Sequence, residues 1–162
     1  MVRGAESSPP PEPCTDRASP PLDEYRRIGE GRRVSWNSLR EQILALLWRT
    51  RTPWGAYGIA HQLSSERDKK HPNSVYRSMR ILESARLVIP IVSWSRYVIS
   101  PDPGIGSWGV ILCSKCRSFA VVPMEDERRW LWSVARGFNF RADRAAIECH
   151  GKCQACSVGN AG

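Results

Sequence analysis

The chain has 162 residues, enough for one modest domain or two small ones, and its 41% hydrophobic residues suffice for a core. Its formal net charge of +8 favours an acidic partner, most often nucleic acid, although a generally cationic surface would give the same total. No apolar run approaches the roughly 18 residues of a membrane-spanning helix, and the N-terminus lacks the apolar stretch of a secretory signal. We therefore expect a cytoplasmic protein with no membrane partner.

The positive charge is concentrated in the middle of the chain. Residues 1–33 hold six basic and six acidic residues, so this segment is neutral. Residues 34–100 hold ten and four, a net charge of +6, whereas residues 101–162 hold eight and six, a net charge of +2. If the protein binds nucleic acid, the middle segment is expected to carry the contact.

The first segment, residues 1–33, is predicted to be a disordered tail. Six of the twelve prolines lie in the first 21 positions, and large apolar side chains are few. Such a segment buries too little surface to offset the entropy lost on ordering. Cys14 lies within it and is expected to be an incidental exposed thiol.

Two helices are predicted next. Asn37 or Ser38 is a good N-cap for a helix that runs to about Arg49. A second, shorter helix is predicted over residues 55–66. Its apolar residues recur at helical spacing, namely Tyr57, Ala60 and Leu63.

A third helix and a β-hairpin complete the first half of the chain. Pro72 precedes the predicted cap, which is Asn73 or Ser74. The apolar stripe of this helix is expected to be core, and it consists of Val75, Met79 and Leu82. Two β-rich runs flank Ser95 and predict a hairpin, after which the Pro- and Gly-rich residues 101–109 predict a linker.

The second half is predicted to have the order β-β-α-β. Strands are expected at residues 110–113, 119–123 and 145–149, and a helix at residues 125–138. Together with the helices and hairpin before the linker, this order predicts an α+β chain with two domains.

Two Cys-x-x-Cys pairs lie in this second half. Cys113 and Cys116 form the first pair, Cys153 and Cys156 form the second, and 36 residues separate them. Four thiolates complete a tetrahedral zinc site with no open coordination position, so we predict one structural Zn²⁺ per chain. A redox dithiol is the alternative, but it usually opens a helix, and neither pair clearly does so.

Cys149 and His150 lie just before the second pair. They are either alternative metal ligands, supports for a ligand, or ordinary residues at the end of a strand.

Helices followed by a hairpin form a winged helix-turn-helix pattern, in which the third helix enters the major groove of double-stranded DNA. A solvated face is the alternative interpretation of its charged residues. Positive charge just before the third helix, including His71, suits phosphate contacts. The candidate DNA-binding residues are Tyr57, Lys69, Lys70, Asn73, Ser74, Tyr76, Arg77 and Arg80.

Four short motifs carry a resemblance to a known family. They are Arg-Glu-Gln-Ile-Leu at residues 40–44, Gly-Ala-Tyr at 55–57, Ser-Val-Tyr-Arg at 74–77, and the ending at 147–156 that contains the second cysteine pair. With these motifs the chain resembles the ferric uptake regulator (Fur) superfamily, and most closely its zinc uptake regulator (Zur) branch.

The resemblance implies a homodimeric regulator, usually a repressor, bound to a palindromic operator. It implies a winged-helix DNA-binding domain at residues 34–100 and a hinge at 101–109. An α/β dimerisation domain with structural zinc follows at 110–157, and residues 158–162 are expected to be flexible. It also implies DNA contacts by Tyr76 and Arg77.

The chain departs from this family at the second, metal-sensing site. By approximate alignment, Ile89, Ser100 and Val121 stand where ligands are expected, and the hinge contains no histidine. Such residues offer no soft or borderline ligand for zinc, iron or nickel. We therefore predict a regulator that keeps the structural zinc but has lost the usual metal switch.

Other functions remain possible from the sequence. The chain could be a zinc-responsive repressor that senses through Cys149, His150 or Asp102, or a partner that forms heterodimers with a true metal sensor and modulates it. An enzyme is disfavoured, because the sequence shows no Ser–His–Asp set, open metal site or phosphate-binding loop. No small-molecule substrate is therefore expected.

Overall fold

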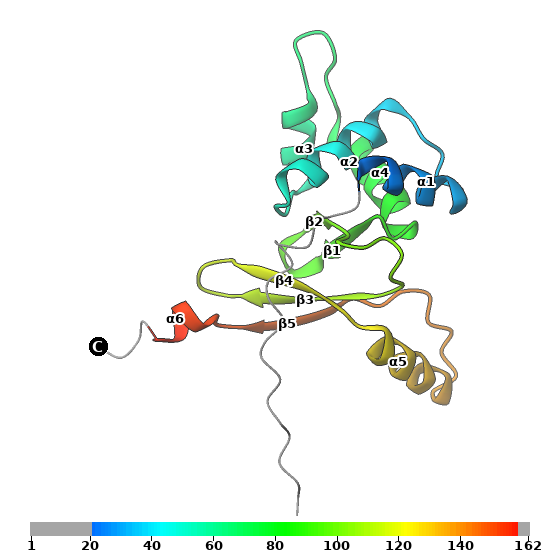
Figure 1. Ribbon diagram of the computed structural model, residues 1–162, viewed down its shortest axis with the longest axis vertical. Coiled ribbons are helices and arrows are strands. Elements are labelled where there is room, and N and C mark those ends of the chain that lie inside the picture. The colour runs from blue at the N-terminus through cyan, green and yellow to red at the C-terminus, as the bar shows by residue number, and fades with distance from the viewer. Residues whose placement is uncertain (1–20, 159–162) are drawn as a thin grey trace, which may run out of the picture.

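A computed structural model describes residues 21–158. Four helices and a two-stranded hairpin form its first half, and a three-stranded sheet with two further helices forms the second (Figure 1). The elements of the first half are α1 (Leu22–Gly31), α2 (Ser38–Thr50), α3 (Ala56–Leu63), α4 (Pro72–Ser84), β1 (Val88–Ile91), the 3-10 turn η1 (Val92–Trp94) and β2 (Arg96–Ile99). The elements of the second half are β3 (Trp108–Cys113), β4 (Phe119–Pro123), α5 (Glu125–Gly137), β5 (Ile147–Gly151) and α6 (Gln154–Val158).

Local signals set the two longest helices of the first half. The Asn37 side chain accepts a hydrogen bond from the Arg40 backbone N–H at 2.9 Å, which confirms Asn37 as the cap of α2. α4 begins earlier than predicted, since Pro72 occupies its first turn and His71, rather than Asn73 or Ser74, is the N-cap. Proline suits the first turn because its missing N–H has no intrahelical partner there.

The apolar stripe of α4 is buried as predicted. Val75, Met79 and Leu82 are all fully inaccessible and pack against α2 and α3. We call α1 to α4 the helical unit, because their buried side chains form one continuous core.

The predicted tail at residues 1–33 is wrong from residue 22 onward. Residues 22–31 form α1, and the fully buried Tyr25 donates a hydrogen bond from its hydroxyl to the Ser100 carbonyl at 2.7 Å. Leu22 and Ile28 share this face and pack against the core of the helical unit. A few apolar residues at helical spacing are thus enough to pack this segment against the rest of the domain. Composition alone does not reveal such packing. Residues 1–20, with Cys14, lie outside the described residues.

The predicted apolar stripe of α3 is right for Ala60, which is buried, and for Leu63, which packs against the core, but wrong for Tyr57. Tyr57 is 72% exposed, whereas Ala56, Ile59 and Ala60 are buried. An eight-residue helix offers only two turns, so spacing alone did not distinguish these faces.

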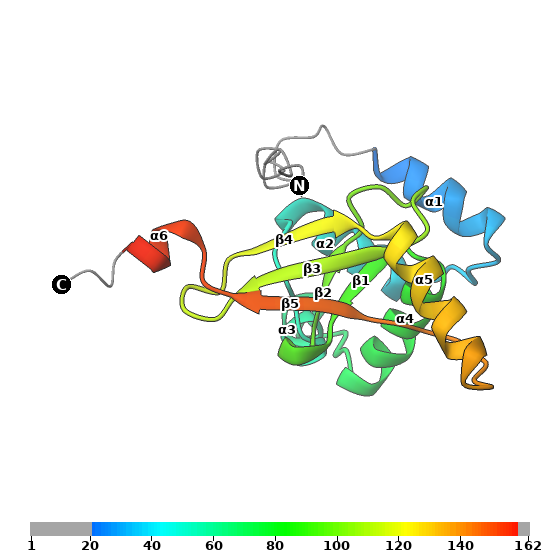
Figure 2. The same ribbon diagram turned by 90° about the horizontal axis from the view of Figure 1, so that it is seen from below.

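The hairpin and the order of the second half agree with prediction. β1 and β2 pair antiparallel, and Ser95 takes the left-handed conformation with φ 51°. We call residues 88–99 the wing. In the second sheet β3 is central, with β4 antiparallel on one side and β5 parallel on the other (Figure 2). We call residues 108–158 the sheet region.

The wing packs against the sheet region through a second apolar core. Its buried members are Ile89, Ile91 and Val98 from the wing, and Val110, Leu112 and Val121 from the sheet. The two halves of the chain are thus joined by buried side chains as well as by the hinge. Among the described residues, no helix has the length and apolar character to cross a membrane.

Candidate metal centre and nucleic-acid interface

The register of β3 and β5 brings the two cysteine pairs together. Cys113 ends β3 directly beside Gly151 at the end of β5, and the Ser114 N–H donates to the Gly151 carbonyl at 2.8 Å. The sulfurs of Cys113, Cys116, Cys153 and Cys156 all lie within 4.8 Å of one another. The pairs predicted from spacing therefore form a single cluster.

Each pair enters the cluster from a tight local structure. The Cys113 N–H donates to the Ser118 carbonyl at 2.9 Å, and Arg117 takes φ 59° to close this turn. Cys153 directly precedes α6, which corrects the expectation that neither pair opens a helix. Its own N–H donates to the Cys113 sulfur at 3.3 Å. Backbone donors thus already point at the thiolate ligands.

The thiols of the cluster differ strongly in acidity. Backbone N–H groups, first that of Cys116 and then that of Cys153, lower the pKa of Cys113 to about 5. Hydrogen bonds from Ser118 also lower the pKa of Cys116. Hydrogen bonding to Cys153 and the other thiols raises the pKa of Cys156 to about 12. Four thiolates this close repel each other, and a divalent cation at their centre would relieve that repulsion.

The cluster fits zinc. Four sulfur donors match the ligands and the tetrahedral geometry of a closed zinc site, which leaves no position for a substrate. Within residues 21–158, it is the one group of three or more His, Cys, Asp or Glu side chains that could hold a metal ion.

Cys149 and His150 lie outside this cluster. Both are exposed on β5, and His150 Nε2 lies 3.3 Å from the Glu148 carboxylate. The structure therefore does not bring them together with the four sulfurs as additional ligands.

The positions predicted to lack sensing ligands are buried. Ile89 and Val121 are 6% and 4% exposed, and both belong to the apolar core between the wing and the sheet region. Ser100 is fully buried, its carbonyl accepts the Tyr25 hydroxyl, and its own hydroxyl has no hydrogen-bond partner among the described residues.

Two polar contacts that the sequence did not indicate also join the wing to the sheet region. The Glu148 carboxylate accepts the backbone N–H groups of Val92 and Ser93. The Arg117 guanidinium lies 5.9 Å from the centre of the Trp94 ring. Because the partners are more than 20 residues apart in the chain, no spacing rule could have found them.

The outer face of α4 is polar and accessible. Asn73, Ser74, Tyr76, Arg77 and Arg80 are all exposed, on the side away from the apolar stripe. The exposed Tyr57 of α3 meets the Tyr76 ring edge-on, with ring centres 6.4 Å apart.

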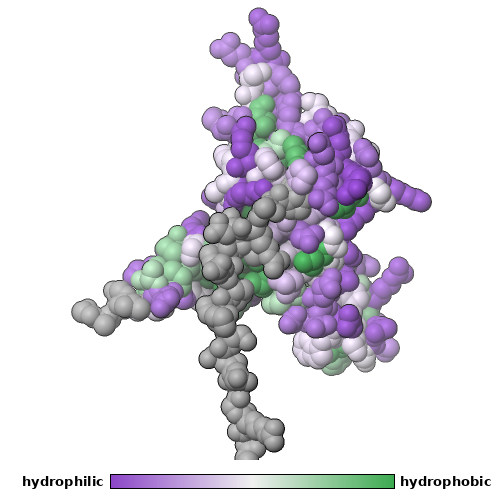
Figure 3. All heavy atoms as spheres, viewed as in Figure 1, coloured by the Kyte–Doolittle hydropathy of each residue, from purple (hydrophilic) through white to green (hydrophobic). Residues whose placement is uncertain are grey.

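The loop between α3 and α4 projects from the helical unit, and its surface is hydrophilic (Figures 1 and 3). The two lysines of this loop differ. Lys69 is exposed, whereas Lys70 is only 14% exposed and pairs with Asp68 at 2.5 Å. Among the predicted loop contacts, Lys69 is thus the accessible cation.

Comparison with solved structures identifies the fold. A zinc uptake regulator complexed with zinc and DNA has a TM-score of 0.73 and 22% identity, over 87% of this chain and 95% of that chain. The chain has the fold of the zinc uptake regulators. The holo form of XcZur has a TM-score of 0.70 at 22% identity, over 85% of this chain and 99% of that one.

The ferric uptake regulator of Helicobacter pylori has the same uptake-regulator fold, with a TM-score of 0.54 and 17% identity over 87% of this chain and 97% of its own. No family model matches the sequence, and no curated protein matches it. The likeness is therefore carried by the structure, at low sequence identity.

Proposed function

We propose that the chain is a DNA-binding transcriptional regulator of the Fur superfamily, closest to its Zur branch. It acts as a homodimer on a palindromic operator, most simply as a repressor, and carries one structural zinc ion per chain. The observation that carries this proposal is the uptake-regulator fold, combined with an exposed polar face on the helix that would enter the major groove. The closed sulfur site supports a regulator rather than an enzyme.

Charge supports the DNA contact. Residues 34–100 carry a net charge of +6, and this segment contains α4 and the wing. Arg77 and Arg80 on α4 suit base edges or phosphates, while Lys69 in the preceding loop suits a phosphate.

Unburied apolar surface supports the homodimer. α5 has no buried residue, and its Trp130 is 67% exposed. Phe138 and Phe140, which follow the helix, are more than 70% exposed. β4 and β5 are both edge strands of the sheet. A second copy of the chain would cover such surface, which a monomer rarely leaves open.

The apolar core between the wing and the sheet region supports the loss of metal sensing. Ile89 and Val121 fill space there with hydrocarbon, and metal ligands would have to displace them. We propose that this core holds the two halves together without a second metal. A zinc-responsive repressor that uses Cys149, His150 or Asp102 is the alternative.

The DNA-binding proposal is tested by selecting bound sequences from random duplexes and measuring their affinity. We expect affinity to fall steeply with salt, and Arg77→Ala to weaken binding about tenfold or more. Arg129→Ala is the matched control, because Arg129 is 80% exposed but lies on α5. Equal losses in both variants, or no selected sequence, would contradict the proposed face. Stable association with another regulator in the absence of DNA binding would instead favour the alternative in which the chain forms heterodimers with a true metal sensor and modulates it.

The zinc proposal is tested by metal analysis beside a zinc titration of operator binding. We expect one zinc per chain and an operator affinity that added zinc leaves unchanged once the sulfur site is full. Two zinc ions per chain with a steep rise in affinity would establish the zinc-responsive alternative.

A further inference from the structure

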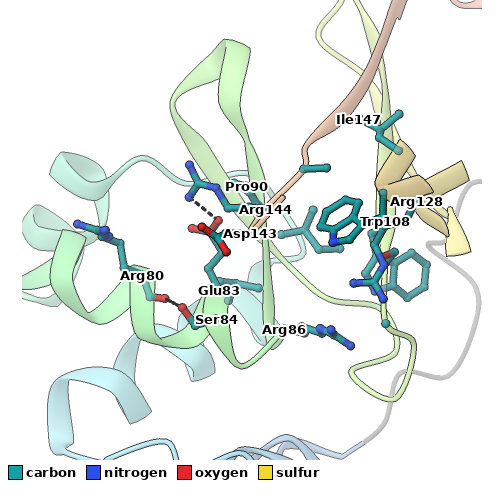
Figure 4. A pocket seen from close by; sticks show the side chains of 16 residues that line it. Arg80, Glu83, Ser84, Arg86, Pro90, Trp108, Arg128, Asp143, Arg144 and Ile147 are labelled. Atoms are coloured by element: carbon teal, nitrogen blue, oxygen red, sulfur yellow. Dashed lines mark hydrogen bonds and ion pairs between the residues drawn. The ribbon is translucent and has the colours of Figure 1, made fainter. Parts of the chain in front are cut away.

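A cavity of about 530 Å³ lies between the helical unit and the sheet region. α4 and β1 form one wall, and the hinge, α5 and the segment before β5 form the other (Figure 4). This volume is in the range of small-molecule sites. The cavity is separate from the sulfur cluster, because none of the four cysteines lines it.

The lining of the cavity is positively charged. It contains four arginines, Arg80, Arg86, Arg128 and Arg144, against two acids, Glu83 and Asp143, which gives a net charge of +2. Arg144 pairs with Glu83 at 3.0 Å across the cavity (Figure 4). Within residues 21–158, the other three arginines form no salt bridge with a carboxylate. No carboxylate in this range thus forms an ion pair with these three, of which Arg80 and Arg86 are exposed to solvent.

Arg86 shows this absence of an ion pair most clearly. It takes φ 58°, and its guanidinium lies against the hinge, where a Cβ on Gly106 would meet it at 3.1 Å. The nearby Glu125 carboxylate accepts the Gly106 N–H at 3.0 Å instead of pairing with Arg86. Burial, and then the charge of Arg86, lower the pKa of Arg32. Arg32 and Arg86 are thus held close, and the Glu125 carboxylate beside Arg86 forms a salt bridge with neither.

Aromatic surface lies beside this charge. Trp108 and Trp132 line the cavity, and the Arg128 guanidinium lies 5.4 Å from the centre of the Trp132 ring. The indole N–H of Trp108 is buried and has no hydrogen-bond partner among the described residues.

We propose that this cavity binds a small flat organic anion, an aromatic ring that carries a carboxylate, sulfonate or phosphate, as an effector of the regulator. Guanidinium groups bind such anions through paired, charge-assisted hydrogen bonds, and the ring stacks on indole or guanidinium faces. The effector role rests on the proposed function. Since both halves of the chain line the cavity, a bound ligand would favour one relative orientation of the DNA-binding helix.

The binding site is tested first, without DNA. 1-Naphthyl phosphate is titrated by calorimetry into the full-length, zinc-loaded protein, with 1-naphthol and inorganic phosphate as comparison probes. We expect 1-naphthyl phosphate to bind about tenfold or more tightly than either comparison, because only it supplies both ring and charge. Equal affinity for 1-naphthol, or no saturable binding of 1-naphthyl phosphate, overturns the proposal.

Substitutions then locate the site. Arg86→Gln and Arg128→Gln should each weaken 1-naphthyl phosphate binding about tenfold. Arg129→Gln, next to Arg128 but outside the cavity, is the matched control and should leave the affinity unchanged. Zinc content and thermal unfolding are measured for each variant to verify folding. An equal loss in the Arg129 variant overturns the assignment to this cavity.

The effector role is tested last, with the selected operator. Linkage requires that an effector bind with different affinities to the free and the operator-bound protein, typically by about fivefold or more. Equal affinities overturn the effector role. If no operator is found, the proposed function fails, while the titration of the free protein still decides whether the cavity binds the anion.

Discussion

The helical unit buries many apolar side chains in a large core, to which Val88 and Ile99 of the wing contribute, whereas the sheet region buries few and shares them with the wing. Tyr25, Ile43, Leu47 and Met79 are fully inaccessible inside the helical core. In the sheet region, no residue from 122 to 157 is buried. Its buried apolar side chains that pack against the wing are Val110, Leu112 and Val121, on β3 and β4.

The difference teaches that one chain uses two sources of stability. A unit with its own core is stable through burial of apolar area. A small sheet without one needs other links, and here these are the sulfur cluster, the contacts to the wing and, in our proposal, a second copy of the chain. Substitutions in the two regions should therefore have different consequences.

The largest effect is expected for Cys153→Ser. Loss of one ligand should release the zinc and unfold much of the sheet region, since metal binding and folding are coupled there. Hydrogen exchange should rise throughout residues 110–157 and remain slow in α2 and α4. Cys149→Ser is the control, because Cys149 lies outside the cluster and should leave zinc content unchanged. A folded, dimeric, zinc-free Cys153 variant would contradict the structural role.

A large effect in the helical unit is expected for Leu47→Ala. The fully buried side chain would leave a cavity, which costs about 2–5 kcal/mol of unfolding free energy. Denaturant unfolding, followed with a probe on α2, should show the same loss of unfolding free energy with and without a zinc chelator. Val92→Ala, at a 58% exposed position, should change stability by less than about 0.5 kcal/mol. A loss that depends on zinc would show that the two regions are not independent.

A smaller effect is expected for Glu148→Gln, at the polar link between the regions. A charge-assisted acceptor of the Val92 and Ser93 N–H groups becomes neutral, which should cost about 1.5 kcal/mol of the local opening free energy. Hydrogen exchange at these two amides should accelerate about tenfold. Unchanged exchange would remove Glu148 from the link.

The same link should depend on pH. Burial raises the pKa of Glu148, but hydrogen bonds from Ser93 and Val92 outweigh it and lower the pKa below the ordinary value of 4.5. A lowered folded-state pKa means that the stabilisation is present above pH 4.5 and is lost as pH falls through the lowered pKa. Protection of the Val92 and Ser93 amides against hydrogen exchange should fall with pH in this way in the native protein. In Glu148→Gln this protection should not change with pH.

The smallest effect is expected for Tyr25→Phe. It removes the hydroxyl that donates to the Ser100 carbonyl and should cost about 1 kcal/mol. Thermal unfolding of the helical unit measures the loss. Tyr57→Phe is the control, because that side chain is 72% exposed and should be neutral. Equal stability of both variants would mean that the ring of Tyr25 alone holds α1 in place.

The sequence by itself determined the helices α2 to α5, the hairpin about Ser95, the β-β-α-β order and the four cysteines of the sulfur cluster. These features depend on short-range information. Caps, apolar spacing and breakers act over one or two turns, and Cys-x-x-Cys fixes a ligand pair within four residues.

Only the tertiary structure decided the docking of α1 through Tyr25 and the outward face of Tyr57. It also decided that the residues at the expected sensing positions, Ile89 and Val121, meet in one apolar core. The cavity between the two halves was likewise decided only by the tertiary structure. Each depends on which distant surfaces face one another, and that follows from how the whole chain packs rather than from any local pattern.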